Sequence, residues 1–143
     1  WGPLSPLYIG TALSYVVLAN WYGYYTVINL ANTTATAATC DITYTSGPGS
    51  TVGTGVSKTY TRVLPSNGAI MIYEGNPINP DSRSDINRDP FWKGSSSVTR
   101  FLGSAVIECK DSQNNPVNVV AFVNEEVDRN GVDSMYTFNT INK

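Results

Sequence analysis

Hydrophobic and polar residues alternate with a period of two along most of the chain. In residues 36–45, for example, Ala38, Cys40, Ile42 and Tyr44 share one face and polar residues share the other. A period of two is typical of a β-strand with one buried face. The pattern predicts strands over residues 7–21, 22–32, 36–45, 56–64, 69–73, 98–110, 117–127 and 132–141. The short link between the second and third strands predicts that these two pair as a hairpin.

This series of short strands and turns predicts an all-β fold, a single Ig-like or jelly-roll-type β-sandwich of seven or eight strands with an extended N-terminal strand. Residues 117–127 are apolar on both faces, which favours a central strand that is covered on both sides. We expect residues 1–21 to form an N-terminal extension and assembly strand, and residues 22–143 to form the sandwich. No internal repeat or second domain is visible.

Residues 74–97 interrupt the strand pattern with three prolines, three aspartates and few apolar residues. An insert of this length is longer than compact domains usually carry, so we interpret it as a functional or interface loop, with one helical turn near residues 81–87. Its large apolar residues are Phe91 and Trp92. We expect both to be buried, with a subunit contact over part of the loop. The alternative is a loop that folds back on its own sandwich.

Composition narrows the range of functions. Only 14% of the residues are charged, against roughly 25% in an average soluble protein. The net charge of −2 leaves no basic face for nucleic acid or an anionic membrane. The chain has no histidine, which removes the commonest general base and metal ligand. With no catalytic motif either, we expect a protein that is not an enzyme. No apolar run reaches the roughly 18 residues of a membrane span.

The two cysteines, Cys40 and Cys109, indicate an oxidising compartment. Each is in phase with the inward residues of its predicted strand, so the pattern predicts a disulfide between two strands, with two buried free thiols as the alternative. The chain begins at Trp1, which we interpret as a processed mature form or a trimmed sequence with no signal peptide left to read. These features favour a secreted, extracellular protein of the cell surface.

Three weaker signals concern ligands and modification. Asn32 begins an Asn-Thr-Thr glycosylation sequon at the predicted hairpin tip. Two acidic runs have the oxygen-rich chemistry that calcium prefers, although acidic and amide residues are also common in turns. The favoured run contains Asp128, Asn130 and Asp133; the other contains Asp81, Asp85 and Asp89. Calcium is therefore the one candidate cofactor. Aromatic residues such as Trp92 also allow stacking on carbohydrate.

From Trp21 onward the chain resembles a β-sandwich module that occurs, often in tandem, in secreted surface proteins of filamentous bacteria. The matching segments are WYGYYTVINLANTTATAATCDITYTSG, PSNGA at residues 65–69, FLGSAVIE at residues 101–108, NPVNVVAFVNEEV at residues 115–127 and DSMYTFNTIN at residues 133–142. The resemblance covers about 120 of the 143 residues and implies a stalk, sheath or adhesion unit without catalytic residues. The single copy, the long loop and the two cysteines depart from it.

The N-terminal strand suggests how such a unit would assemble. Its apolar face contains Leu7, Ile9, Leu13, Tyr15, Val17 and Trp21. Fully extended, residues 7–21 would span about 50 Å, longer than a typical strand of about 17–20 Å. We therefore expect residues 1 to about 18 to complete the sandwich of an adjacent copy by β-augmentation.

Head-to-tail contacts of this kind do not close, so they produce fibres. The leading hypothesis is a homo-polymeric subunit of an extracellular filament, pilus-like fibre or tube. A monomeric cell-surface adhesion or carbohydrate-binding module is the alternative. A capsid or surface-layer lattice protein is a third class.

Overall fold

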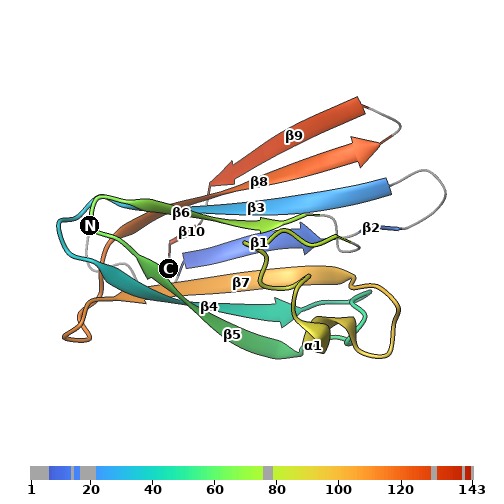
Figure 1. Cartoon of the computed structure of the whole chain (residues 1–143), viewed down its shortest axis with the longest axis horizontal. Helices are drawn as coiled ribbons and strands as arrows, with labels where there is room; N and C mark the ends of the chain where they lie inside the picture. Colours follow the sequence, from blue (N-terminus) through green and yellow to red (C-terminus); the bar gives the residue numbers. More distant parts are fainter. Residues whose placement is uncertain are drawn as a thin grey trace.

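The computed structural model describes residues 7–13, 15–16, 22–75, 79–129, 132–139 and 141–142. In this part the chain forms ten strands and one four-residue helix, so the predicted all-β class is confirmed (Figure 1). Sheet A consists, in spatial order, of β10 (Ile141–Asn142), β1 (Leu7–Leu13), β7 (Phe101–Lys110), β4 (Ala38–Ser46) and β5 (Ser57–Leu64). Sheet B consists of β2 (Tyr15–Val16), β3 (Tyr22–Asn32), β8 (Val119–Arg129) and β9 (Val132–Asn139), and β6 (Ala69–Glu74) pairs with β3.

The core lies between the two sheets and follows the alternation of the sequence. Along β4 every second residue is buried from Ala38 onward. The large aliphatic side chains that are fully buried in the described core are Ile28, Leu30, Ile42, Leu64, Ile72, Ile86, Ile107 and Val123. Each contributes roughly 1.5–3 kcal/mol relative to an exposed side chain. The described residues contain no helix that is long and apolar enough to cross a membrane.

The predicted N-terminal strand over residues 7–21 is not one strand. β1 belongs to sheet A, where it pairs with β7 of the same chain from Leu7 opposite Ile107 to Leu13 opposite Phe101. β2 belongs to sheet B, where it pairs with β3. The chain therefore passes from sheet A to sheet B between β1 and β2. The long alternating pattern in the sequence corresponds to two strands in different sheets. Val17 and Trp21 lie outside the described residues.

The predicted hairpin of residues 22–32 and 36–45 is wrong. β3 belongs to sheet B and β4 to sheet A, so the link between them crosses from one sheet to the other. The Asn32 side chain holds this crossing: its Nδ2 donates to the Thr36 carbonyl at 2.7 Å, and its Oδ1 accepts from the Thr34 amide at 3.0 Å. Polar turn residues are compatible with a hairpin and with a crossing, and here the inter-sheet connection is the one formed.

Strand β8 is central in sheet B, between β3 and β9, as its apolar sequence predicts. Its inward residues Ala121 and Val123 are buried, whereas Val120 and Phe122 on the other face are 53% and 37% exposed. In the single chain, therefore, the predicted cover exists on one face of β8 only.

The disulfide Cys40–Cys109 is present, so this prediction is confirmed. The two residues are direct partners in the β4–β7 ladder, with their Cα atoms 4.0 Å apart, and both are buried. The bond therefore fixes the register of two neighbouring strands in the middle of sheet A.

Replacing both cysteines by alanine should lower the free energy of unfolding by about 4 kcal/mol, because the bond closes a loop over a sequence separation of 69 residues. Urea unfolding followed by tryptophan fluorescence measures this loss. Reduction of the unmodified protein before unfolding is the control and should give the same midpoint. A change below 1 kcal/mol in both measurements would contradict the role of the bond.

Candidate functional site

The polar side chains of the edge strand β5 that point inward meet the long segment between β6 and β7. Along β5, Lys58, Tyr60 and Arg62 alternate with the exposed residues Ser57, Thr59, Thr61 and Val63. The segment leaves sheet B at the end of β6 and enters sheet A at β7, so it crosses the open side of the sandwich (Figure 1). Each of the three inward side chains bonds to an aspartate of this segment, either Asp85 or Asp89.

Arg62 and Tyr44 hold the buried carboxylate of Asp85. The Arg62 guanidinium forms an ion pair with Oδ1 of Asp85, and the Tyr44 hydroxyl donates to Oδ2 at 3.1 Å. Burial raises the pKa of Asp85, and the ion pair with Arg62 opposes this effect. Burial also raises the pKa of Tyr44 well above its ordinary value, so its hydroxyl remains a donor at neutral pH.

Glu74, at the end of β6, fixes the backbone of the same loop. Its side chain is fully buried and accepts hydrogen bonds from the Asp85 and Ile86 amides at 2.7 and 2.9 Å, and from the Ser84 hydroxyl. Burial raises the pKa of Glu74, while the hydrogen bonds from Ser84 and the amides oppose that shift. One side chain thus satisfies several loop donors that would otherwise be buried without acceptors.

Asp89 connects the loop to β5 and to the helix α1 (Pro90–Lys93). Its Oδ1 caps the helix by accepting from the Phe91 amide at 2.9 Å, and its Oδ2 binds Lys58 and the Tyr60 hydroxyl. Partial burial raises the pKa of Asp89, but the bonds from Lys58 and Tyr60 outweigh this effect and the net pKa is lowered. The Tyr60 hydroxyl also accepts from Nε1 of Trp92 at 2.7 Å.

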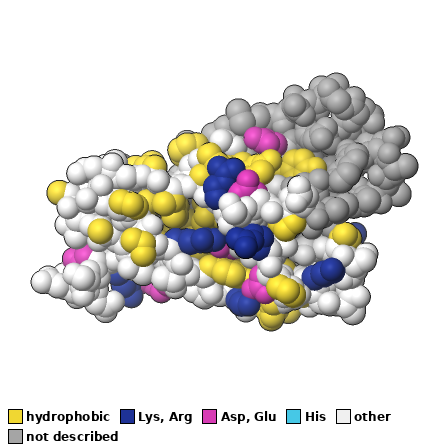
Figure 2. Space-filling view, in the orientation of Figure 1, with side chains coloured by type: hydrophobic (Ala, Val, Ile, Leu, Met, Phe, Trp, Pro, Cys, Tyr) yellow, Lys and Arg dark blue, Asp and Glu magenta, His cyan; other side chains and the backbone are white. Residues whose placement is uncertain are grey.

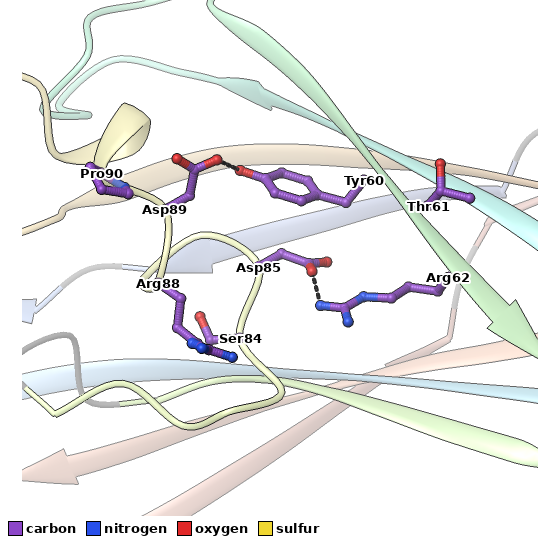
Figure 3. A pocket seen from close by; sticks show the side chains of 8 residues that line it. All are labelled: Tyr60, Thr61, Arg62, Ser84, Asp85, Arg88, Asp89 and Pro90. Carbon is purple, nitrogen blue, oxygen red and sulfur yellow. Dashed lines mark hydrogen bonds and ion pairs between the residues drawn. The ribbon is translucent and has the colours of Figure 1, made fainter.

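These contacts border an open cleft of about 420 Å³ between β5 and the loop (Figure 3). The lining residues are Tyr60, Thr61, Arg62, Ser84, Asp85, Arg88, Asp89 and Pro90. Arg88 donates to the Ser82 carbonyl at 2.9 Å, and it interacts electrostatically with Asp81 without forming an ion pair with a described carboxylate. The cleft is therefore lined mainly by polar and charged side chains, of which Arg88 forms no ion pair among the described residues.

The two large apolar residues of the loop, Phe91 and Trp92, differ in how far they are buried. Trp92 is fully buried and packs edge-on against Phe101, with ring centroids 4.9 Å apart. Phe91 is 41% exposed in the single chain, so the fold alone does not bury it, and its burial at a subunit contact stays a prediction. The loop folds onto its own sandwich, and a contact with another subunit stays a prediction. The predicted helical turn near residues 81–87 consists of turns and bends, and α1 begins at Pro90.

The acidic residues of the loop do not converge on a cation site. Asp81 pairs with Arg83, whose hydrogen bonds lower the pKa of Asp81 to about 2, while Asp85 and Asp89 are bound by Arg62 and Lys58. The described residues contain no group of three or more histidine, cysteine or acidic side chains placed to hold a metal.

The other predicted ligand and modification residues are placed only in part. Asp128 and Asp133 are partners in the β8–β9 ladder, and Asn130 lies outside the described residues, so calcium at this turn stays a prediction. Asn32 is 2% exposed and its amide closes the crossing described above, so a glycan on this residue would require the link to open.

The sequence interpretation missed Glu74, Tyr44, Arg62 and Arg88. One signal was present: β5 places Lys58 and Arg62 on the inward face of a strand, where a charged side chain needs a partner. The aspartates of the loop are the partners that this alternation requires. The role of Glu74 has no comparable signal, because its partners are mainly backbone amides.

Comparison with known proteins identifies the fold alone. No protein-family model matches the chain, and no curated protein matches it. A solved structure, the crystal structure of Thermotoga maritima 1070, is similar with a TM-score of 0.62 and 8% sequence identity. The similarity covers 99% of this chain and 96% of that chain. At this identity it supports a shared architecture and carries no function.

Asp89→Asn should destabilise the protein in a pH-dependent way. The pKa of Asp89 is lowered in the folded state, so its stabilising contribution is present above the unfolded value of about 3.9 and is lost as the pH falls through the folded value. We expect a loss of roughly 0.5–1 kcal/mol at pH 6, the scale of a partly exposed ion pair. Urea unfolding at pH 6 and pH 2.5 measures it.

Lys58→Met removes the partner of the same ion pair and should reproduce this pH dependence. A loss in Asp89→Asn that remains the same at pH 2.5 would show that the carboxylate charge is not responsible.

Proposed function

We propose that the chain is a structural subunit of an extracellular filament, pilus-like fibre or tube, in which β1 of one copy pairs with β7 of the next. The observation that carries the proposal is the position of β1. It lies between β10 and β7 in sheet A, and seven consecutive residues pair with β7 from Leu7 to Leu13. This strand is N-terminal to the other described elements, so its exchange needs only one hinge.

The edge that β1 covers gives a physical reason for the exchange. Without β1, the stretch of β7 from Phe101 to Ile107 would expose its backbone groups, and an open edge of this kind pairs readily with another chain. The inward residues of this stretch, Phe101, Ala105 and Ile107, are all buried. The same strand from a second copy would form the same register, so exchange replaces every pairing that it breaks.

The geometry of exchange favours an open polymer. A strand that leaves one copy and enters the next makes a heterologous contact, and repeated heterologous contacts produce filaments unless their rotation closes a ring. The buried disulfide supports an oxidising, extracellular setting. The proposal includes no catalytic step and no cofactor.

The finer fold assignment is also part of this proposal. We assign the sandwich to an Ig-like or jelly-roll type with an added N-terminal strand, of the kind found in bacterial surface-protein modules. The main support is that β3, β4, β5, β6 and β7 divide between the two sheets, with consecutive strands in one sheet only for β4 and β5.

A monomeric adhesion or carbohydrate-binding module is the second candidate, and the open cleft favours it. Arginine, tyrosine and carboxylate side chains line the cleft beside Pro90, and Phe91 next to it is exposed. This function would need no strand exchange, so the two candidates predict different oligomeric states.

A cysteine pair placed across β1 and β7 distinguishes them. Gly10 and Ser104 are direct partners in this ladder, and both native cysteines are already paired, so Gly10→Cys with Ser104→Cys adds two unpaired thiols. After mild oxidation, strand exchange predicts a ladder of covalent multimers on a non-reducing gel. Each single-cysteine variant is a control and should form at most a dimer.

A product that runs only as a monomer, with no remaining free thiol, would contradict strand exchange. The same result would favour the monomeric adhesion module.

A further inference from the structure

The outer edge of β5 presents free backbone groups. Ser46 of β4 donates its amide to the Val56 carbonyl and accepts from the Gly55 amide, so the even-numbered residues of β4 direct their backbone toward β5. The even-numbered residues of β4 pair with Lys58, Tyr60 and Arg62. The alternate residues, Ser57, Thr59, Thr61 and Val63, therefore point their amides and carbonyls away from β4. β5 is the last strand of sheet A, so no described strand pairs with these groups.

The cleft runs along this same edge. Tyr60, Thr61 and Arg62 are consecutive residues of β5 and all three line the cleft. Because consecutive side chains of a strand point to opposite faces of the sheet, the cleft must extend around the outer edge of β5. The loop from Ser84 to Pro90 forms the other wall (Figure 3). The volume of about 420 Å³ lies within the usual range of binding clefts, roughly 300–1,000 Å³.

The charges in the cleft favour an acidic partner. Asp85 and Asp89 are bound by Arg62 and Lys58 and by tyrosine hydroxyls. Arg88 donates a hydrogen bond to the Ser82 carbonyl and interacts electrostatically with Asp81, but it forms no ion pair with a described carboxylate. The lining contains two arginines and two aspartates. Because both aspartates already form ion pairs, Arg88 is the charged side chain of the lining that forms no ion pair among the described residues. Figure 2 shows basic side chains in the middle of one face of the molecule, with acidic side chains beside them.

We propose that this cleft binds an extended acidic peptide, which adds to sheet A beside β5. The free backbone groups of Thr59 and Thr61 would form the ladder, and a carboxylate on the peptide would pair with Arg88. Lys58 and Arg62 are inward-pointing charged residues of an edge strand, and such residues disfavour non-specific pairing of the edge with other chains. The site therefore selects by charge as well as by backbone, and it does not depend on the exchange of β1.

Two synthetic probes test the proposal: acetyl-Thr-Val-Glu-Val-Glu-Val-amide, and the same peptide with its glutamates moved by one position, which covers both side-chain registers. Amide hydrogen exchange of the full chain should show protection of Thr59 and Thr61 when one of them binds. The glutamine analogue should bind about tenfold more weakly, the scale of a lost charge-assisted hydrogen bond. An analogue N-methylated at alternate residues should not protect the two amides.

Protein variants separate the roles of charge and backbone. Arg88→Ala should weaken binding about tenfold, whereas the matched control Arg100→Ala, at an exposed arginine outside the cleft, should bind as the unmodified chain does. Equal affinity for the N-methylated analogue would show binding of an anion without strand addition and would overturn the proposal. So would the absence of binding by both probes, or unchanged binding to Arg88→Ala.

A second copy of the chain is the competing occupant of this edge. It would protect Thr59 and Thr61 without any peptide, and to a degree that rises with protein concentration. That result would also overturn the proposal. Failure of the peptide test leaves the cysteine pair across β1 and β7 unaffected, so the two ideas are judged separately.

Discussion

The hydrogen bonds that the buried carboxylate of Glu74 accepts fix the loop that covers the open side of the sandwich. The carboxylate lies where the chain leaves sheet B, and it accepts hydrogen bonds from the Ser84 hydroxyl and from the amides of Asp85 and Ile86. A buried carboxylate is costly unless such donors surround it. Because these donors belong to the loop, satisfying Glu74 also fixes the loop, and with it the position of Asp85 beside Arg62.

From this anchor the loop acts as a side wall between the two sheets. Asp85 and Asp89 are bound by inward side chains of β5, and Trp92 fills the core beside Phe101. The same contacts leave the outer edge of β5 open and place Arg88 beside it. A segment that lacks strand pattern is thus an integral part of the fold, and it shapes the cleft while it closes the core.

The alternation of the sequence predicts the faces of strands better than their partners. It correctly indicates that Cys40 and Cys109 point inward, because burial of alternate residues is a local property of each strand. It does not indicate that β3 and β4 lie in different sheets, since either arrangement buries the same residues. The division of residues 7–21 between two sheets is hidden for the same reason.

The cleft was beyond sequence reasoning because its contacts join distant residues. Arg62 and Asp85 are 23 positions apart, and Tyr44 and Asp85 are 41 positions apart. Only the inward lysine and arginine of β5 indicate that carboxylates must lie opposite. Glu74 accepts hydrogen bonds from backbone amides, which every residue except proline has, so the sequence does not show which amides are its partners.

Native-state hydrogen exchange at the Asp85 and Ile86 amides tests the anchoring role of Glu74 most directly. If Glu74 holds the loop as part of the core, these amides exchange as slowly as the amide of Ile42 in the middle of β4, and Glu74→Gln accelerates them while Ile42 remains slow. Exchange of both amides in the unmodified protein at the rate of exposed loop residues such as Arg88 would contradict this account.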